Sequence, residues 1–424
     1  MKKIKIGIFG LRRGRALIHC IQVLDGEVVA VCDSNGARVQ KAREVIGSDV
    51  PAFTDFEEFF KVEMDCVYLA NYFTDHAKVA ARFLEKGVHV LSECTSNVTM
   101  SDGVLLVRAA QKSRAQYMLA ENYPFMLFNQ EMKTVYEGGT LGKGLFAEGE
   151  YNHPFSPYDT DFIKSVRPFL GHWRHYLPAT YYVTHSLAPL MYATGSVPKR
   201  VTAFPVYDPH GDEYASASYV GDRAAIITTL NDDGSVFRVT GCSEFGAHEN
   251  SYRLACENGQ IENVRGTDGK VMLRYNDWAI PEGREENNFY MPEYHGPHPE
   301  EVDSAGHGGG DFFVVETFFD CLRRGKPVPF DVYFSTTMAS VAILSHRSVM
   351  EGGKPYDIPD FHREEDLKKY VNDTVSPFPD AATGKATYPC CSHPDYHPSE
   401  VQLRKYREVL KRAPREKRDP GKVL

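Results

Sequence analysis

The segment IGIFGLRRGRAL, residues Ile6–Leu17, combines a short apolar strand, a glycine-containing turn and the start of a helix. Gly10 and Gly14 fall in the turn, where glycine lets the backbone approach a pyrophosphate, and the following helix presents its positive end to the phosphates. The second strand closes on Asp33, twenty-three residues after Gly10, where an acid accepts hydrogen bonds from the ribose hydroxyls. The sequence therefore predicts a dinucleotide site near the start of the chain.

The turn departs from the usual G-x-G-x-x-G pattern, because Arg12 stands where the second glycine belongs. A tight turn that holds no ligand is therefore the alternative. We expect Arg12 and Arg13 to lie against the cofactor, since they form the middle of the turn. The carboxylate of Asp33 repels a 2′-phosphate, which favours NAD over NADP, although the nearby Arg38 keeps NADP open.

Residues 1–122 alternate short apolar strands with helices. This alternation predicts a Rossmann domain, an α/β fold with a doubly wound parallel sheet. The predicted strands are Ile4–Phe9, Val28–Cys32, Asp65–Ala70, Val88–Ser92 and Gln116–Ala120, and the predicted helices are Arg15–Leu24, Ala37–Ile46, His76–Lys86 and Gly103–Ser113.

Residues 123–360 have a different sequence pattern. Longer alternating stretches such as GLFAEGEYNH and AAIITTLNDDGSVFRVTG appear, with turn signals at NDDG and ENG. They predict a second, α+β domain with a mostly antiparallel sheet. Helices return at Phe312–Arg324 and Ser335–Met350. Residues 361–424, rich in Pro, His and charge, are predicted to form a C-terminal extension that wraps the molecule as an arm and ends in a solvated basic helix and tail.

Composition limits the classes of partner. A net charge of −9 argues against nucleic acid, which selects a basic face. Nine cysteines at irregular spacing do not form a disulfide framework, so we expect reduced thiols and a cytoplasmic protein. The start MKKIKIGIFG lacks the apolar stretch of a signal peptide, and no apolar run has the length of a membrane span.

Taken together, these segments resemble the Gfo/Idh/MocA family of NAD(P)-dependent, mainly sugar-acting oxidoreductases over residues 3–360. The resemblance rests on the N-terminal turn and on DHAKVAARFLEKGVHVLSE, GGTLGKGLFAEGEY and FFDCLRRGKPVPFDV. It implies a second domain with a large open sheet that makes oligomer contacts, in a dimer or tetramer. It also implies a sugar as the small-molecule substrate, with the nicotinamide between the two domains.

Two family motifs are altered in this chain. Dehydrogenases of the family carry E-K-P after the strand that corresponds to Val88–Ser92, but here Glu93, Cys94 and Thr95 follow it, so the lysine is absent. The family's acid–x₃–His–x₂–acid motif keeps only its histidine, His185, because Tyr181 and Ala188 occupy the places of the acids.

The segment Tyr182–Pro189, YVTHSLAP, is similar to one branch of the family, the NAD-dependent glycosidases acting on α-linked N-acetylgalactosamine. The pair Trp173-Arg174 and the stretch GHGGGDFF, residues Gly306–Phe313, fit this branch as well. Phe125 differs from the branch, which has a tyrosine there. The branch implies oxidation of a ring hydroxyl, elimination of the glycoside, addition of water and return of the hydride, so that the cofactor is recycled.

Candidate residues follow from these patterns and from the resemblance. His185 is the expected acid/base, because histidine titrates where the chemistry runs; a buried histidine that bonds a backbone carbonyl is the alternative. Tyr182, one helical turn earlier, is its expected catalytic partner. The further cofactor-binding candidates are Asn71, His76, Glu93 and Asn122, and the substrate-binding candidates are Tyr151, His153, Trp173, Arg174, His307 and Asp311.

No metal site is predicted. The cluster Cys390, Cys391, His393 and His397 lacks the C-x₂-C spacing of zinc sites. Three functions remain open. The first is an NAD-dependent oxidoreductase that removes hydride from a ring carbon of a sugar. The second is a redox-neutral NAD-dependent glycosidase, and the third is a dinucleotide-binding protein without catalytic activity.

Overall fold

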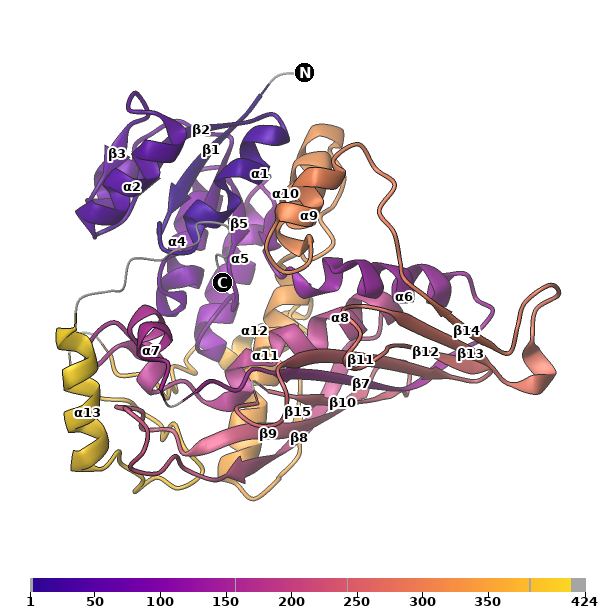
Figure 1. The fold of residues 1–424 in the computed structure, drawn as a ribbon. Coiled ribbons are helices and arrows are strands. Elements are labelled where there is room, and N and C mark those ends of the chain that lie inside the picture. Colours follow the sequence, from indigo (N-terminus) through magenta and orange to yellow (C-terminus); the bar gives the residue numbers. More distant parts are fainter. Residues whose placement is uncertain (1–2, 157, 242, 381–382, 413–424) are drawn as a thin grey trace.

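The computed structural model describes residues 3–156, 158–241, 243–380 and 383–412. Two sheets and the helices around them form the molecule, with the N-terminal sheet above the second, longer one in Figure 1. The end of the predicted basic tail lies outside the described residues. Within the described part of the chain, no helix has the length and apolar character needed to cross a membrane.

The N-terminal sheet has six parallel strands in the order β3-β2-β1-β4-β5-β6. This is the order of a dinucleotide-binding Rossmann sheet, so the predicted fold of this domain is confirmed. The strands are β1 Ile4–Phe9, β2 Gly26–Cys32, β3 Ala52–Phe53, β4 Cys66–Leu69, β5 His89–Ser92 and β6 Tyr117–Leu119. Its helices are η1 Gly14–Leu17, α1 Ile18–Val23, α2 Gly36–Ile46, α3 Phe56–Phe60, α4 His76–Glu85 and α5 Met100–Lys112.

The second sheet has nine strands in the order β14-β13-β12-β11-β7-β10-β9-β8-β15. Only β7 and β10 pair in parallel, so the prediction of a mostly antiparallel sheet is also confirmed. The strands are β7 Gly144–Asn152, β8 Pro198–Tyr207, β9 Asp222–Asn231, β10 Val236–Thr240, β11 Glu249–Cys256, β12 Gly259–Asn263, β13 Val271–Tyr275, β14 Asn287–Tyr290 and β15 Tyr356–Asp357.

Four long helices from the second half of the fold pack against the two domains. The helices α6 Leu127–Glu137 and α8 Thr184–Thr194 pack against the second sheet, whereas α10 Gly310–Arg324 packs against α1 of the Rossmann domain (Figure 1). The helix α11 Val332–Met350 contacts both β8 and α5, and most of its side chains are buried. The Rossmann domain is therefore covered partly by helices from late in the chain.

The contact between α8 and β7 is unusually close at Gly149. A Cβ atom at Gly149 would lie 2.0 Å from the carbonyl oxygen of Ser186, closer than real Cβ atoms approach a backbone oxygen. The strand backbone therefore lies directly on the first turn of α8, with no side chain between them. This contact fixes the height of that turn above the sheet.

The remaining helices lie in connecting segments and at the C-terminal end. They are η3 Tyr123–Phe125, α7 Thr160–Val166, η4 Trp173–His175, η5 Ala179–Tyr182, η6 Asp277–Ala279, α9 Pro299–Ser304, α12 Glu364–Tyr370 and α13 Glu400–Lys411. We call residues 361–412 the C-terminal arm. Its last helix begins with a capping box, in which Ser399 and Gln402 bond each other's backbone amides.

Candidate functional site

The turn after β1 is built around Gly10. Gly10 has φ +93°, and a Cβ atom there would lie 2.2 Å from the carbonyl oxygen of Ala70, so only glycine fits. The amide of Gly14 donates to the carbonyl of Gly10 at 3.1 Å and closes the turn. The helical segment η1–α1 follows directly. The predicted glycine turn is therefore present at the carboxyl end of β1.

Asp33 lies beside this turn, at the end of β2. Its carboxylate accepts hydrogen bonds from the amide of Leu11, at 2.8 Å, and from the amide of Asn35, also at 2.8 Å. Arg38 lies 3.5 Å from the same carboxylate, and Asp33 as a whole is 5% exposed. The acid therefore holds the turn to β2, and Arg38 reaches the edge where NADP would carry its phosphate.

Three arginines gather near the turn. Burial and the repulsion of Arg174 and Arg38 lower the pKa of Arg12 to about 10. Within the described ranges, Arg12 forms no ion pair with a carboxylate. This uncompensated positive charge fits a bound diphosphate, which would supply the missing anion.

Unused polar atoms mark the same edge of the sheet. The side-chain oxygens of Asn71 and Thr95, after β4 and β5, are buried without a hydrogen-bond partner. Such atoms suit the amide and hydroxyl groups of a nicotinamide nucleotide, so the residues present fit NAD. His76 differs, because its two ring nitrogens lie 2.9 and 3.1 Å from the carbonyls of Thr95 and Asn71. We therefore assign His76 to holding these two loops together.

The guanidinium of Arg13 is bound by two carboxylates. Its Nε donates to Glu93 at 2.9 Å, and its two terminal nitrogens donate to Asp311 at 2.8 and 2.6 Å. Glu93 also accepts a hydrogen bond from the hydroxyl of Tyr68 at 2.5 Å. The turn is therefore tied to the first residues of α10 by a bidentate ion pair.

Asp311 is the centre of this network. Besides Arg13, its carboxylate accepts from Asn122 at 2.7 Å and lies 3.1 Å from His307 Nδ1. Asp311 is 2% exposed, whereas the side chain of His307 is 34% exposed. The sequence predicted that Asp311 binds the substrate, but its carboxylate already interacts with the side chains of Arg13, Asn122 and His307. We therefore assign Asp311 and Asn122 to positioning Arg13 and His307.

His185 faces a buried acid that the sequence patterns did not single out. His185 Nδ1 lies 2.8 Å from Oε1 of Glu121, which follows β6 and is fully buried. The thiol of Cys94 donates to the other oxygen of Glu121 at 3.0 Å. The acids missing from the motif around His185 are therefore replaced by one acid from the Rossmann domain. The sequence did contain one signal for Glu121. Like Asp33 and Glu93, it follows a strand of the parallel sheet.

The charge of Glu121 is maintained despite its burial. Burial alone would raise its pKa, but the attraction of His185 and hydrogen bonds from His185, Cys94 and the amide of Tyr123 outweigh burial, so the pKa lies below its ordinary value. A carboxylate in this position accepts a hydrogen bond from the imidazole and fixes the orientation of the ring. The pair is therefore equipped to accept and return a proton.

Aromatic rings surround His185. Tyr123 stacks on the imidazole with ring centroids 4.3 Å apart, and Tyr151 and Tyr182 meet its edges at 5.0 and 5.4 Å. The hydroxyl of Tyr252 donates to the carbonyl of His185 at 2.6 Å. The structure thus brings the two predicted catalytic residues and Tyr151 together in one cluster, to which Tyr123 adds a ring.

A second group of predicted residues borders this cluster. The guanidinium of Arg174 lies over the rings of Trp173 and Tyr182, at 4.5 and 5.5 Å from their centroids. The Nε atom of Arg174 and the indole nitrogen of Trp173 are both buried without a hydrogen-bond partner. His153 lies 5.8 Å from Tyr151, and its Nδ1 is buried without a partner too. These nitrogens are available to a polar ligand.

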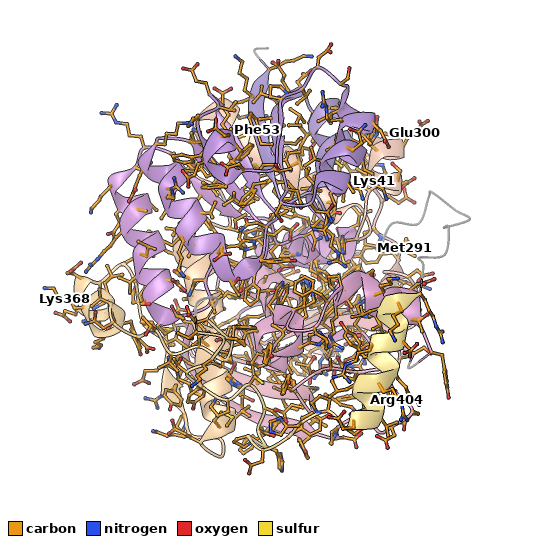
Figure 2. The ribbon with its side chains drawn as sticks, turned by 90° about the vertical axis from the view of Figure 1, so that its left-hand side faces the viewer. Lys41, Phe53, Met291, Glu300, Lys368 and Arg404 are labelled. Atoms are coloured by element: carbon orange, nitrogen blue, oxygen red, sulfur yellow. The ribbon has the colours of Figure 1, made fainter. Side chains whose placement is uncertain are left out.

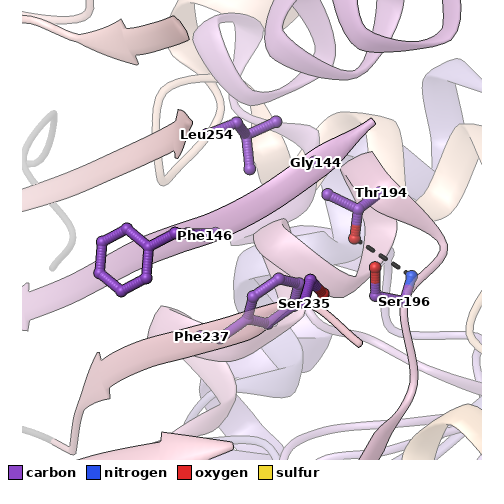
Figure 3. Close-up of a pocket in the computed structure, with 8 residues that line it drawn as sticks. Gly144, Phe146, Thr194, Ser196, Ser235, Phe237 and Leu254 are labelled. Carbon is purple, nitrogen blue, oxygen red and sulfur yellow. Dashed lines mark hydrogen bonds between the residues drawn. The ribbon is translucent and has the colours of Figure 1, made fainter. Parts of the chain in front are cut away.

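A small cavity lies elsewhere in the second domain. It is too narrow to hold a water molecule and is lined by residues of β7, β10, β11 and the end of α8. Figure 3 shows Phe146, Phe237 and Leu254 around it, with the amide of Ser196 donating to Thr194. None of the predicted site residues lines it, so we treat it as a packing feature of the sheet.

The Cys/His cluster of the C-terminal arm is engaged in packing. Cys391 accepts a hydrogen bond from the amide of Gly221 at 3.3 Å, and His393 stacks on Tyr207 at 3.5 Å. Over the ranges that the structure describes, no group of three or more His, Cys, Asp or Glu side chains is arranged to hold a metal ion.

Two family models match the chain. Residues 4–121 match the oxidoreductase family, NAD-binding Rossmann fold, and residues 260–368 match the C-terminal domain of glycosyl hydrolase 109. These matches confirm the NAD-binding Rossmann domain and the resemblance to the Gfo/Idh/MocA family with its glycosidase branch.

Similar proteins agree with both matches. A glycosyl hydrolase family 109 protein of Streptomyces filamentosus is 25% identical over 401 residues, which cover 85% of this chain and 78% of that protein. A family 109 protein of Akkermansia muciniphila is also 25% identical and covers 86% and 82%. Among solved structures, levoglucosan dehydrogenase in complex with NADH and L-sorbose shares the fold, with a TM-score of 0.71, 16% identity and coverage of 85% and 100%.

Proposed function

We propose that this chain, which joins a Gfo/Idh/MocA NAD-binding domain to a glycosyl hydrolase 109 C-terminal domain, is an NAD-dependent enzyme that oxidises a ring hydroxyl carbon of a sugar. The observation that carries the proposal is the pair of His185 and the buried Glu121, 2.8 Å apart and enclosed by three tyrosines. The pair lies at the carboxyl edge of the Rossmann sheet, where ligands bind in such folds.

His185 supplies the proton transfer that this oxidation needs. With Nδ1–H donated to Glu121, Nε2 is left as the acceptor for the proton of a substrate hydroxyl. The anionic Glu121 then stabilises the imidazolium that forms. The Gly10 turn would hold NAD, which would supply the hydride acceptor for the carbon that bears this hydroxyl. Tyr182 adjoins the imidazole and is the second group that we place at the reacting oxygen.

The surroundings of this pair suit a sugar. Tyr151, Tyr182 and Trp173 offer aromatic faces and edges, and the partnerless donors of Trp173, Arg174 and His153 suit hydroxyl groups. His307 joins them, because its ring lies 5.9 Å from that of Tyr123 and is partly exposed. Solved structures of the same fold carry sugars, as the complex of levoglucosan dehydrogenase with L-sorbose does.

A redox-neutral glycosidase is the second candidate. It is favoured by the match of residues 260–368 to the glycosyl hydrolase 109 domain and by the segment Tyr182–Pro189. Such an enzyme uses the same oxidation internally and returns the hydride to the product. Cys94 in place of lysine is compatible with it, because the His185–Glu121 pair can serve as the proton-transfer group without lysine.

We extend the proposal to assembly and location. The face of the second sheet that carries Glu148 and Glu150 holds cross-strand ion pairs with Arg238, Arg253 and Arg265, and a homo-oligomer would form through this sheet. A cytoplasmic location fits the cysteines, since the eight that the structure describes are free.

One set of assays separates the functions. A dehydrogenase accumulates NADH absorbance with NAD and a free sugar such as levoglucosan. A glycosidase cleaves nitrophenyl N-acetyl-α-galactosaminide, accumulates no NADH and exchanges a ring C–H for solvent deuterium. His185→Ala is expected to lower kcat by about 10²- to 10⁴-fold in whichever reaction occurs, while NAD still binds. Full activity in that variant would refute the assignment of His185, and NAD binding without either reaction would indicate a binding protein.

A further inference from the structure

The C-terminal arm reaches both domains, and most of it lies beyond the segments that the family models match. Those matches end at residue 368, whereas the arm continues to residue 412. Figure 2 shows Lys368 of α12 and Arg404 of α13 on opposite sides of the molecule, so the arm crosses this face from one side to the other. Many of its contacts fall on residues 207–222, and a further set falls on a segment that borders the proposed sugar site.

Tyr406 of α13 is the centre of the first contact. It is fully buried, and its hydroxyl donates to the carbonyl of Arg167 and lies 3.2 Å from Nε2 of His175. Its ring meets that of His175 edge to face, with centroids 5.2 Å apart. Ile163 and Val409 form a small apolar cluster with Tyr406, separate from the main core. Helix α13 is therefore anchored to α7 and to the residues that follow α7.

The segment held in this way, residues 167–176, leads directly to the site. Its residue Trp173 packs on Phe73, which follows β4 of the Rossmann domain, at 4.5 Å. Its residue Arg174 lies over the ring of Tyr182, which in turn meets His185. We call residues 167–176 the bridging segment, because it contacts the Rossmann domain and the His185 cluster at once.

A second contact of the arm reaches the bridging segment through Phe73. Phe378 of the arm meets Phe73, on which Trp173 packs, at 5.0 Å, and it meets Tyr181, which precedes Tyr182, at 5.4 Å. The chain just before Phe378 is fixed to α11, because Arg347 donates both terminal nitrogens to Asp373 at 2.8 and 2.7 Å.

We propose that the C-terminal arm is a positioning element for the sugar side of the site. Through Tyr406 directly, and through Phe378 by way of Phe73, it holds the bridging segment so that Trp173 and Arg174 border the His185 cluster. The proposal rests on the proposed function for its substrate. It assigns no chemical step to the arm. The arm acts by reducing the freedom of two ligand-facing side chains before the sugar binds.

Tyr406→Phe tests the proposal, because it removes the hydroxyl that bonds Arg167 and His175 but keeps the ring in the apolar cluster. The expected result is a rise in KM for nitrophenyl N-acetyl-α-galactosaminide, or for the free sugar that is oxidised, of about three- to tenfold. We expect kcat and the Kd for NAD to stay within about twofold, because the His185–Glu121 pair and the Gly10 turn are untouched.

Hydrogen exchange supplies a readout that needs no turnover. In the full chain with NAD present, Tyr406→Phe is expected to speed amide exchange in residues 163–176 by about tenfold and to leave residues 4–121 unchanged. Arg404→Gln, on the exposed face of the same helix in Figure 2, is the matched control and should change neither KM nor exchange.

The outcomes are distinguishable from those that test the proposed function. Unchanged exchange in the bridging segment, unchanged KM, or a Kd for NAD that rises by the same factor as KM would each overturn the positioning role. If the wild-type protein turns over no sugar, the proposed function fails, and the exchange result alone decides whether the arm holds the segment.

Discussion

At the scale of single residues, the chemistry depends on an acid placed beneath a histidine. Glu121→Gln keeps a hydrogen-bond acceptor for His185 Nδ1 but removes the charge that stabilises the imidazolium. We expect kcat to fall by about 10²-fold or more, with little change in the Kd for NAD.

Glu85→Gln, at the exposed end of α4, is a suitable control for this change. If Glu121→Gln retained wild-type kcat, the carboxylate would be only a packing group, and His185 would act without it.

The sequence predicted His185 but not its partner, and the reason is physical. His185 was found from the residues around it, whereas Glu121 lies sixty-four positions earlier and meets it only because β6 ends against α8. Asp311 shows the reverse case. The residues next to Asp311 in the sequence favoured a role in ligand binding. In the structure, Arg13, nearly three hundred residues away, forms an ion pair with the Asp311 carboxylate. Contacts between distant segments decide both roles, and no local pattern records them.

At the scale of elements, the turn between β1 and η1 is the part that tolerates least change. Gly10→Ala places a Cβ atom against the carbonyl of Ala70 at a positive φ. We expect the free energy of unfolding to fall by about 1–3 kcal/mol and the Kd for NAD to rise at least about tenfold. Calorimetric titration with NAD and denaturant unfolding measure the two effects.

Gly36→Ala is the matched control for the turn. Gly36 begins α2 and has no atom within 4 Å of an added Cβ, so this change should be neutral or slightly stabilising, by about 0.5 kcal/mol. Equal losses of NAD affinity in the two variants would show that the Gly10 turn has no special part in binding.

Most elements of the Rossmann domain were predicted within a few residues, because each strand is a short apolar run that ends at a turn. The helices and strands that were not predicted are short or are not bounded by clear turn residues. Strand β3 has two residues and α3 has five, and in the second domain α6, β13 and β14 also escaped prediction. Their positions depend on packing against neighbours more than on local periodicity.

At the scale of the whole molecule, the ion pair of Arg13 with Asp311 joins the first turn of the chain to a helix three hundred residues later. Arg13 and His307 outweigh the effect of burial and hold the pKa of Asp311 well below its usual range. Asp311 therefore stabilises the folded state above about pH 4, the value at which it titrates when unfolded, and this contribution is lost as the pH falls further.

Asp311→Asn should remove this contribution. We expect a loss of about 3 kcal/mol in the free energy of unfolding at pH 7 and a shallower decline of stability below pH 4 than in the wild type. Urea unfolding at several pH values measures both, with Glu300→Gln on the exposed face of α9 as the control (Figure 2). If the free energy of unfolding changed with pH in the same way in wild type and in Asp311→Asn, the stabilising role of the Arg13–Asp311 ion pair would be contradicted.

Gly149 affects how the activities of variants of this protein should be interpreted. Because strand and helix backbones touch there, even one added methyl group must lift the first turn of α8 or bend β7. His185 belongs to that turn and would be carried with it, away from Glu121, which is anchored in the other domain. A loss of turnover caused by a residue with no side chain would thus report on the alignment of the two domains.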